Sequence, residues 1–423
     1  MRILIVSYEA WRNSNNGGNV LSNVFGAFPD ADIAQIYCSG ELPQNDICTK
    51  YFQISDSSLL SKRKGRRLPE KDYGNSAEES ENSVENSVKG KIPGILSSAA
   101  LLARELLWSL GGWRTKELAE FVNEFVPDVI FAPCYYYYHV TKVALFVKSI
   151  AKCPMISYIS DDNYSLKQFR FEPSFWINRI ITRKWIRRHF AECSLVYTMT
   201  DMQKWEYESV FHRPMKVLCK SADFTERTRP VGRPVKLIYA GGLYLNRWKI
   251  LMALSKAIAE INAGGHCAEL HIYSGSVLGK AAEEALNDGE NSILHRQIPY
   301  SELVEEYRRS DIAVHVESFD LRNRLVTRLS FSTKIIDCLS SGCAILAIGP
   351  ADQAGIAYLR DNDAAVCVDD IKKVTDAVRA LVTDDKKILE YSRNACLLGK
   401  KNHLKAEIDK AIRQDFSEIV SNE

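Results

Sequence analysis

Twelve short apolar runs recur along this 423-residue chain and alternate with longer amphipathic segments. Most of these runs are apolar at consecutive positions, which is typical of parallel strands that helices cover on both faces. Strand and helix in repeated succession favour a doubly wound α/β fold. The predicted strands span residues 2–8, 32–38, 128–134, 155–160, 195–200, 216–220, 236–241, 269–273, 293–297, 312–317, 344–348 and 365–368.

The pattern restarts near the middle of the chain. A polar, turn-rich segment, SADFTERTRPVGRP, is followed by KLIYAGG, a strand-then-glycine unit like the one that opens the chain. Such a segment is typical of an interdomain linker. We therefore predict two Rossmann-like domains, residues 1–228 and 229–402, which face one another across a ligand-binding cleft. Residues 403–423 are predicted to form a helix that packs on either domain, with the N-terminal domain as one candidate.

One region interrupts this pattern. Residues 55–91 join the basic cluster KRKGRR to a Ser/Asn/Glu-rich stretch with few apolar residues, so we predict a flexible insertion. The next segment, GILSSAALLARELLWSLGGW, is strongly apolar and carries little charge. Two interpretations stay open for it: a buried helix of the first domain, or an exposed helix at a membrane interface.

Composition excludes several classes of protein. Lys and Arg (55) nearly balance Asp and Glu (53), so bulk charge does not indicate a nucleic-acid-binding protein. No apolar stretch reaches the ~18–20 residues of a spanning helix, and the N-terminus lacks a signal-peptide pattern, so we expect a cytoplasmic protein. The 11 cysteines form no CxxC pair, which favours reduced core thiols. The Asp-x-Asp pairs lie in turns before strands, and we predict no metal site.

Two glycine pairs follow predicted strands. Gly17 and Gly18 precede a predicted helix, where backbone N–H groups and the helix dipole favour an anion. A turn that needs positive φ explains the same residues equally well, and the dinucleotide fingerprint G-x-G-x-x-G is absent. Gly241 and Gly242, followed by Arg247, repeat the arrangement in the second half.

A stronger signal precedes IIDCLSSG. Ser332 is a candidate N-cap, which places Thr333 and Lys334 in the first helical turn. A cation there is unfavourable unless an anion binds, so the segment favours a phosphate site over a simple cap. Asp337, one turn later, is placed to reach hydroxyl groups of the same ligand.

Carboxylates also follow predicted strands, where open α/β sheets bind ligands. Glu317, with Asp320 nearby, is a candidate to hold sugar hydroxyls; the alternative is an exposed ion pair with Arg322 or Arg324. In the first half, Asp161 and the His139 that follows four tyrosines mark an acceptor site, although such residues are often structural. The stretch FWINRIITRKWIRRHF is a basic amphipathic helix that suits anionic lipid or a solvated face.

The motifs YAGGLYLNR, ESFD and FSTKIIDCLSSGCAILAIGP resemble the retaining GT-B glycosyltransferases of family 4. The resemblance covers nearly the whole chain apart from residues 55–91. It implies that the C-terminal domain binds a nucleotide-diphosphate sugar as co-substrate, with no further cofactor, and that the N-terminal domain binds the acceptor.

By position, the family's phosphate-binding basic pair falls at Gly242 and Arg247, and Lys334 supplies the missing charge. Glu317 matches the first of the family's paired glutamates, and Asp337 lies where the second would be. Main-chain atoms near Ile298 match the segment that recognises the base. The family's chemistry implies that the departing phosphate accepts the proton, without a metal, while His139 or Asp161 orients the acceptor hydroxyl.

The basic helix and the polybasic insertion suggest a lipid-diphosphate-linked acceptor and an anionic membrane surface as partners. From these we expect an enzyme of exopolysaccharide or capsule assembly at the inner face of the plasma membrane, with no nucleic-acid partner. Two alternatives are a GT-B nucleotide-sugar epimerase and a catalytically inactive GT-B subunit that binds a partner.

Overall fold

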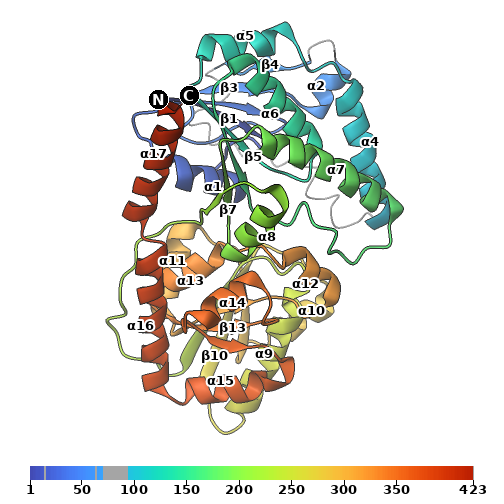
Figure 1. The fold of residues 1–423 in the computed structure, drawn as a ribbon. Coiled ribbons are helices and arrows are strands. Elements are labelled where there is room, and N and C mark those ends of the chain that lie inside the picture. Colours follow the sequence, from blue (N-terminus) through green and yellow to red (C-terminus); the bar gives the residue numbers. More distant parts are fainter. Residues whose placement is uncertain (14–15, 62–63, 70–93, 423) are drawn as a thin grey trace. The chain divides into compact units, whose positions relative to one another are not determined.

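The computed structural model describes the whole chain except residues 14–15, 62–63, 70–93 and 423 (Figure 1). The chain divides into two compact units. The N-terminal unit is made of Met1–Leu218 and Asp409–Glu423, and the C-terminal unit is Cys219–Ile408. The sequence predicts domain boundaries after residues 228 and 402. In the structure the first boundary lies earlier, after Leu218, because the following segment packs on the C-terminal unit. There the Ala222 N–H donates to the His403 carbonyl over 3.0 Å.

An eight-stranded sheet forms the centre of the N-terminal unit, in the order β4-β3-β2-β1-β5-β6-β7-β8. All neighbouring strands are parallel except β3 and β4. The strands are β1 (Arg2–Ser7), β2 (Asp32–Tyr37), β3 (Lys50–Gln53), β4 (Arg66–Arg67), β5 (Val129–Pro133), β6 (Met155–Ile159), β7 (Leu195–Thr198) and β8 (Met215–Val217). Their central residues are buried, as continuous apolar runs predict.

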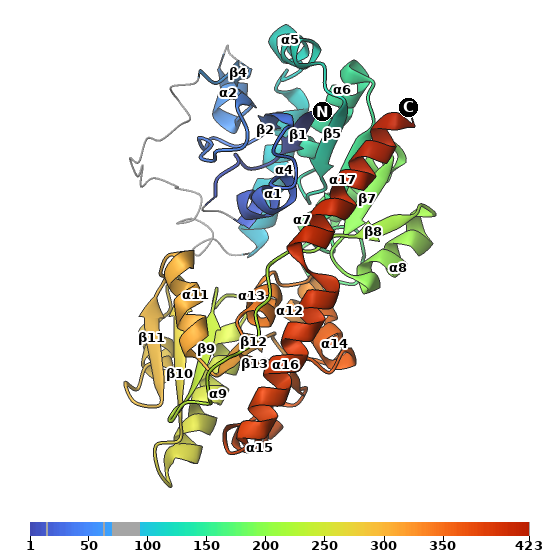
Figure 2. The same ribbon diagram turned by 90° about the vertical axis from the view of Figure 1, so that its left-hand side faces the viewer.

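Helices flank this sheet. They are α1 (Asn16–Phe25), α2 (Asp56–Leu60), α4 (Gly94–Leu110), α5 (Lys116–Phe125), α6 (Tyr138–Ala151), α7 (Pro173–Ala191) and α8 (Asp201–Phe211). The last helix, α17 (Lys405–Ser421), runs beside β7 and β8 (Figure 2). On α17, Phe416 is fully buried against Phe28, and Asp415 accepts a hydrogen bond from the Tyr197 hydroxyl over 2.6 Å. The C-terminal residues thus complete the core of the N-terminal unit.

The described part of residues 55–91 is ordered, contrary to the predicted flexible insertion. Ser55 caps α2 through a capping box, and β4 pairs with β3. Leu59 and Leu68 are buried, so two apolar anchors fix a segment that is polar on average. Within the basic cluster, Arg67 pairs with Glu124 over 2.7 Å. The remainder, residues 62–63 and 70–91, lies outside the described residues.

The C-terminal unit has a six-stranded, all-parallel sheet in the order β11-β10-β9-β12-β13-β14. The strands are β9 (Val235–Ala240), β10 (Ala268–Ser274), β11 (Ser292–Arg296), β12 (Ile312–Val316), β13 (Ala344–Ile348) and β14 (Val366–Val368). The helices are α9 (Arg247–Asn262), α10 (Lys280–Leu286), α11 (Tyr300–Arg309), α12 (Leu321–Thr327), α13 (Lys334–Ser340), α14 (Ala354–Asp361), α15 (Val374–Val382) and α16 (Asp385–Asn402), with a 3-10 turn, η2 (Ile371–Lys373). One apolar core joins the sheet to α9, α15 and α16.

All twelve predicted runs are strands, and both sheets have the same strand order at their centres. In each sheet the chain first adds strands on one side of its opening strand, β1 or β9, and then crosses to the other side. Ligands of such sheets bind at this crossover, outside the carboxyl ends of the strands. The crossover lies between β1 and β5 in one unit and between β9 and β12 in the other.

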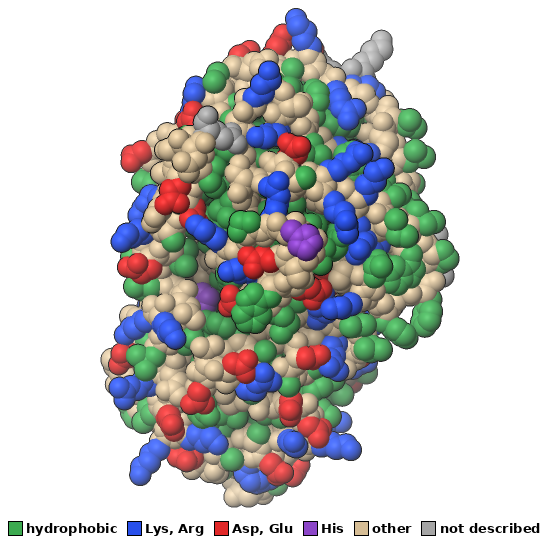
Figure 3. All heavy atoms as spheres, in the orientation of Figure 1, with side chains coloured by type: hydrophobic (Ala, Val, Ile, Leu, Met, Phe, Trp, Pro, Cys, Tyr) green, Lys and Arg blue, Asp and Glu red, His purple; other side chains and the backbone are tan. Residues whose placement is uncertain are grey.

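The two units differ in surface character. Side chains of both charges are interspersed over the C-terminal unit, whereas hydrophobic side chains gather along the edge of the N-terminal unit where α4 and α7 lie (Figure 3). Among the described residues, no helix has both the length and the hydropathy needed to cross a bilayer.

Candidate functional site

The candidate site lies at the crossover of the C-terminal sheet. Gly241 directly follows β9 and Glu317 directly follows β12, and these two strands are neighbours in the sheet. Lys334 opens α13, and its side chain reaches the same strand ends. The structure therefore brings together three of the residues that the sequence singled out, Gly241, Glu317 and Lys334.

Arg247 and Glu317 form a buried ion pair. The Arg247 Nη2 atom lies 2.9 Å and 3.1 Å from the two carboxylate oxygens of Glu317. Leu245 and Asn246 both adopt positive φ, and this turn places Arg247 at the start of α9. Burial raises the pKa of Glu317, while the facing guanidinium opposes this shift.

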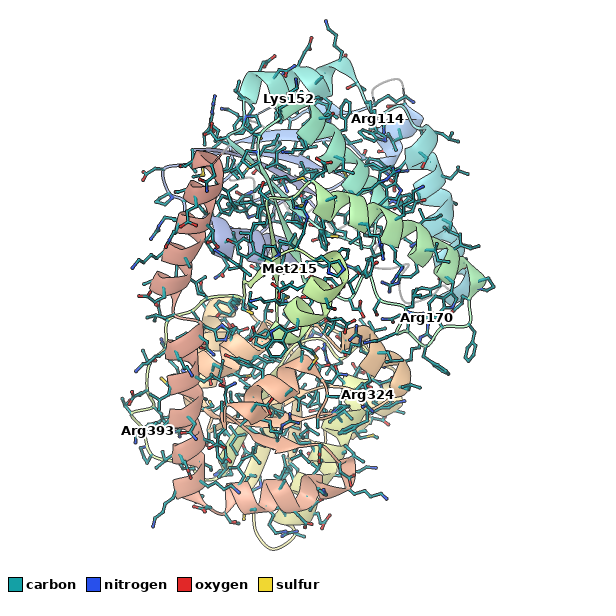
Figure 4. All side chains as sticks on the ribbon, in the orientation of Figure 1. Arg114, Lys152, Arg170, Met215, Arg324 and Arg393 are labelled. Carbon is teal, nitrogen blue, oxygen red and sulfur yellow. The ribbon has the colours of Figure 1, made fainter. Side chains whose placement is uncertain are left out.

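The expected exposed pairing of Glu317 with Arg324 is wrong. Arg324 instead pairs with Asp352 over 2.5 Å, and its position on α12 is labelled in Figure 4. The reason is burial: Glu317 lies at the strand end inside the unit, whereas Arg324 and Asp352 are exposed. Asp320, expected to hold sugar, caps α12 through Asn323 and accepts a hydrogen bond from Asn246 over 2.6 Å.

Lys334 carries a buried cation that lacks a hydrogen-bond partner among the described residues. Its Nζ lies against Gly241, where a Cβ atom would come within 1.7 Å of it. Gly241 has φ +153°, a backbone conformation that residues with a side chain rarely adopt. This conformation and the absence of a side chain together allow the Lys334 Nζ atom to approach the Gly241 backbone closely. Burial, followed by the charge of Arg247, lowers the pKa of Lys334 to about 8.

His315 was missed by the sequence reasoning. Its Nε2 lies 3.6 Å from the Glu317 carboxylate and is buried without a hydrogen-bond partner among the described residues. Burial, with the charges of Arg247 and Lys334, lowers the pKa of His315 to about 3, so the ring is neutral. The signal that could have identified His315 is its position as a polar residue inside the apolar run IAVHVE.

The charges of this site do not balance. Arg247 and Lys334 are cations, Glu317 is one carboxylate, and His315 is neutral. Burying an excess charge costs free energy unless a counter-charge binds. The arrangement therefore suits an anion, with the Lys334 ammonium as the group left to contact it.

Several predicted donor contacts have other roles. Asp337 accepts from Lys220 over 2.5 Å and from the Tyr300 hydroxyl over 3.1 Å, so its carboxylate is already engaged. The predicted N-cap, Ser332, is displaced by one residue: Thr333 is the cap and makes no side-chain cap bond. Thr333 has helical φ and ψ, which does not suit a side-chain cap.

The remaining donor residues line the neighbouring strand ends. A Cβ on Gly242 would lie 2.1 Å from the Tyr244 ring, so this glycine makes room for an aromatic side chain. Ile298 is half-buried in the connection between β11 and α11. The adjacent Gln297 side chain packs on Gly275, where a Cβ would lie 2.4 Å from its Oε1 atom.

In the N-terminal unit, Gly17 and Gly18 begin α1. A Cβ on Gly18 would lie 1.9 Å from the Arg12 carbonyl oxygen, so close backbone packing explains this glycine. His139 is fully buried, stacks on Trp108 and lies 2.8 Å from Glu105 through Nδ1.

This burial corrects the expectation that His139 orients an acceptor hydroxyl, because the ring is enclosed by side chains and cannot touch a bound ligand. Asp161 is exposed at the end of β6. It stays a predicted acceptor residue.

Residues 254–411 match a family model described as glycosyl transferase-like. Within the matched range, Glu317 directly follows β12 and Lys334 opens α13, whereas β9 and the glycine turn precede it. No curated protein sequence matches the chain significantly.

Solved structures share the fold of the whole chain. The Anabaena protein Alr3699/HepE in complex with UDP and glucose aligns over 99% of this chain and 100% of its own, with TM-score 0.63 and 12% identity. Sucrose-phosphate synthase of Thermosynechococcus elongatus aligns over 100% of both chains, with TM-score 0.62 and 11% identity. The trehalose 6-phosphate synthase of Burkholderia multivorans aligns over 100% and 97%, with TM-score 0.60 and 10% identity. The chain thus has the GT-B fold of two α/β units.

No group of three or more His, Cys, Asp or Glu in the described parts of the chain is arranged to hold a metal ion. Metal-independent chemistry stays a prediction.

Proposed function

We propose that this protein is a glycosyltransferase that moves a sugar from a nucleotide-diphosphate sugar to an acceptor hydroxyl. The observation that carries the proposal is the buried Lys334 ammonium without a hydrogen-bond partner, which lies against Gly241 beside the Arg247–Glu317 pair. A diphosphate supplies the counter-charge that this site lacks.

The residues fit the chemistry of the transfer. When the bond from the anomeric carbon to the diphosphate breaks, negative charge develops on the departing phosphate. Lys334 and Arg247 are fixed cations that stabilise this charge, and Glu317 holds Arg247 in place. The acceptor hydroxyl forms the new bond to the same carbon, and its proton passes to the departing phosphate. We propose that the transfer retains the anomeric configuration and needs no metal.

The comparisons support the class of donor. One protein of the same fold, Anabaena Alr3699/HepE, is solved both with UDP and glucose and with UDP-glucose. For the acceptor we propose a lipid-linked glycan in exopolysaccharide or capsule assembly at the inner face of the plasma membrane. This finer proposal is supported by two helices of the N-terminal unit: the exposed side chains in the described part of α4 carry no charge, and the second half of α7 is basic.

Lys334→Ala tests the site. Turnover of the nucleotide sugar should fall by ~10²-fold or more, because one preorganised donor to the developing charge is lost. The matched control is Lys256→Ala, an exposed lysine on α9, which should keep full activity. Thermal denaturation shows that both variants are folded. Full turnover in Lys334→Ala would remove the phosphate assignment.

Nucleotide binding and product analysis distinguish the proposed transferase from the two alternatives, an inactive binding subunit and an epimerase. UDP, GDP, ADP and dTDP are each added to the wild-type protein, and one of them should raise the melting temperature by mass action. If none does, the protein is an inactive binding subunit. If the donor sugar changes configuration without an acceptor, it is an epimerase.

A further inference from the structure

One face of α4 is unusual for an exposed helix. The solvent-exposed side chains of its described part carry no charge; they are Ala99, Ala100, Ala103, Leu106, Ser109 and Leu110. Leu106 is 59% exposed and Leu110 is 78% exposed. Helices that face water normally carry charged or polar side chains on that side.

The charged residues in the described part of α4 both point elsewhere. Arg104 donates to Asp56 over 3.0 Å and to the Tyr8 hydroxyl over 2.8 Å. Glu105 is buried beside His139. The N-terminal unit thus uses the charges of α4 internally and leaves its outer face apolar.

Helix α7 packs along α4 and extends this surface. Ile177 and Ile180 are 52% and 63% exposed in the first half of α7, and Phe171, just before the helix, is 83% exposed. Figure 3 shows hydrophobic side chains gathered along the edge where α4 and α7 lie, with basic side chains beside them. Arg170, labelled in Figure 4, lies at the same end of the unit. Contiguous exposed apolar patches of this kind mark interaction sites.

The second half of α7 is basic and contains no acidic residue. Lys184 and Arg188 are exposed there, and the Arg188 guanidinium lies 5.0 Å from the centre of the Trp185 ring. The Lys142 ammonium of α6 lies 5.2 Å from the centre of the same Trp185 ring. Apolar side chains next to an aromatic ring and cations form the pattern of a helix that lies on a bilayer.

We infer that the α4–α7 face, made of Leu106, Leu110, Phe171, Ile177 and Ile180 with the basic end of α7, seats the protein on an anionic lipid bilayer. The inference deepens the proposed function, on which it rests, because a lipid-linked acceptor is presented at such a surface. A second copy of the chain fits less well, because a two-fold contact places the patch against itself. The described residues that make up the patch include no acidic side chain to pair with the cations of α7.

Flotation of the purified full-length protein with lipid vesicles tests the inference. The probes are vesicles of phosphatidylcholine alone and of phosphatidylcholine with phosphatidylglycerol. The wild type should float with the anionic vesicles and not with the neutral ones, and rising salt should weaken the association. Leu106→Glu with Leu110→Glu should reduce the bound fraction at least tenfold.

A matched double variant controls for added charge. Leu389→Glu with Leu397→Glu alters two exposed leucines of α16, and should float like the wild type. Equal flotation of the α4 variant and the wild type overturns the inference, as does a wild type that ignores anionic vesicles. A stable dimer that the α4 variant abolishes also overturns it, in favour of self-association.

The nucleotide melting shift is measured on the same samples. An α4 variant that loses flotation but keeps the shift is folded and retains the donor site, so the loss belongs to the surface. If flotation behaves as expected and no nucleotide shifts the melting temperature, the proposed function fails while the membrane face stands.

Discussion

The two glycine turns of this protein, Gly17–Gly18 and Gly241–Gly242, look alike in sequence but have different structural roles. After β1, Gly18 allows the Arg12 backbone to pass at close range. After β9, Gly241 makes room for the Lys334 ammonium. The first glycine therefore serves packing, whereas the second makes room for a buried ammonium that lacks a hydrogen-bond partner among the described residues. A strand followed by glycines predicts a turn at the crossover of the sheet, but not what the turn contains.

The buried carboxylates show the same contrast. In the N-terminal unit, Glu105 lies beside His139, whose pKa is lowered mainly by burial. In the C-terminal unit, Glu317 faces Arg247, with Lys334 close enough to influence its pKa. The first unit thus pairs an acid with a neutral ring, and the second holds one more cation than carboxylates. This surplus charge distinguishes the candidate donor site from the corresponding end of the other sheet.

Removing the buried carboxylate of each unit, Glu105 or Glu317, gives the largest expected difference in the free energy of unfolding between the two units. Glu317→Ala should lower the free energy of unfolding by about 3–5 kcal/mol, because it leaves a buried guanidinium without its partner. Glu105→Ala should cost about 1–3 kcal/mol, the loss of a hydrogen bond to a neutral ring. Urea denaturation, followed with a probe in each unit, measures both. Equal losses would show that the charge states of the two pairs do not differ as described.

The glycines provide the next test. Gly18→Ala should destabilise the N-terminal unit by about 1–3 kcal/mol, because its Cβ meets backbone atoms that cannot move independently. Gly241→Ala meets the end of a flexible lysine, so it should cost about 1–2 kcal/mol through its backbone conformation and mainly weaken UDP binding. Melting temperature and calorimetric UDP titration separate the effects. Unchanged UDP affinity in Gly241→Ala, with a normal fold, would contradict this prediction.

A pH dependence provides a further test. The pKa of Lys334 is about 8 in the folded protein, against about 10.4 for lysine in an unfolded chain. Between these values the unfolded chain binds more protons, so stability rises with pH. Lys334→Met should therefore raise the melting temperature of the nucleotide-free protein at pH 7, and this gain should shrink between pH 8 and about 10.4.

The same proton controls ligand binding in the wild type. UDP affinity should fall by about tenfold per pH unit above pH 8, because the ammonium loses its charge. The Lys334→Met variant should bind weakly without this slope. An identical slope in the variant would assign the titration to another group.

The fold was predictable because its signal is local. Each central strand is a continuous apolar run, so β9 and β12 are readable one at a time. The short strands β3 and β4 lack such runs: β3 has four residues and β4 has only two arginines. The order of residues 55–61 and 64–69 depends on two buried leucines, which average composition conceals.

The site was predictable only in part, because its contacts are distant in sequence. Arg247 and Glu317 are separated by 70 residues, and no spacing rule joins them. Lys334 was identifiable because a cation at a helix start is unfavourable without an anion. The engagement of Asp337 by Lys220, 117 residues away, left no trace in the motif that contains it.

The helix α17 has a consequence for how the chain is made. The C-terminal unit is one continuous segment, Cys219–Ile408, inserted between two parts of the other unit. Phe416 can join the core around Phe28 and Phe131 only after the whole of the C-terminal unit has been synthesised. A stop codon within the C-terminal unit therefore also removes the closing helix of the N-terminal unit, even though every residue of the N-terminal sheet is present.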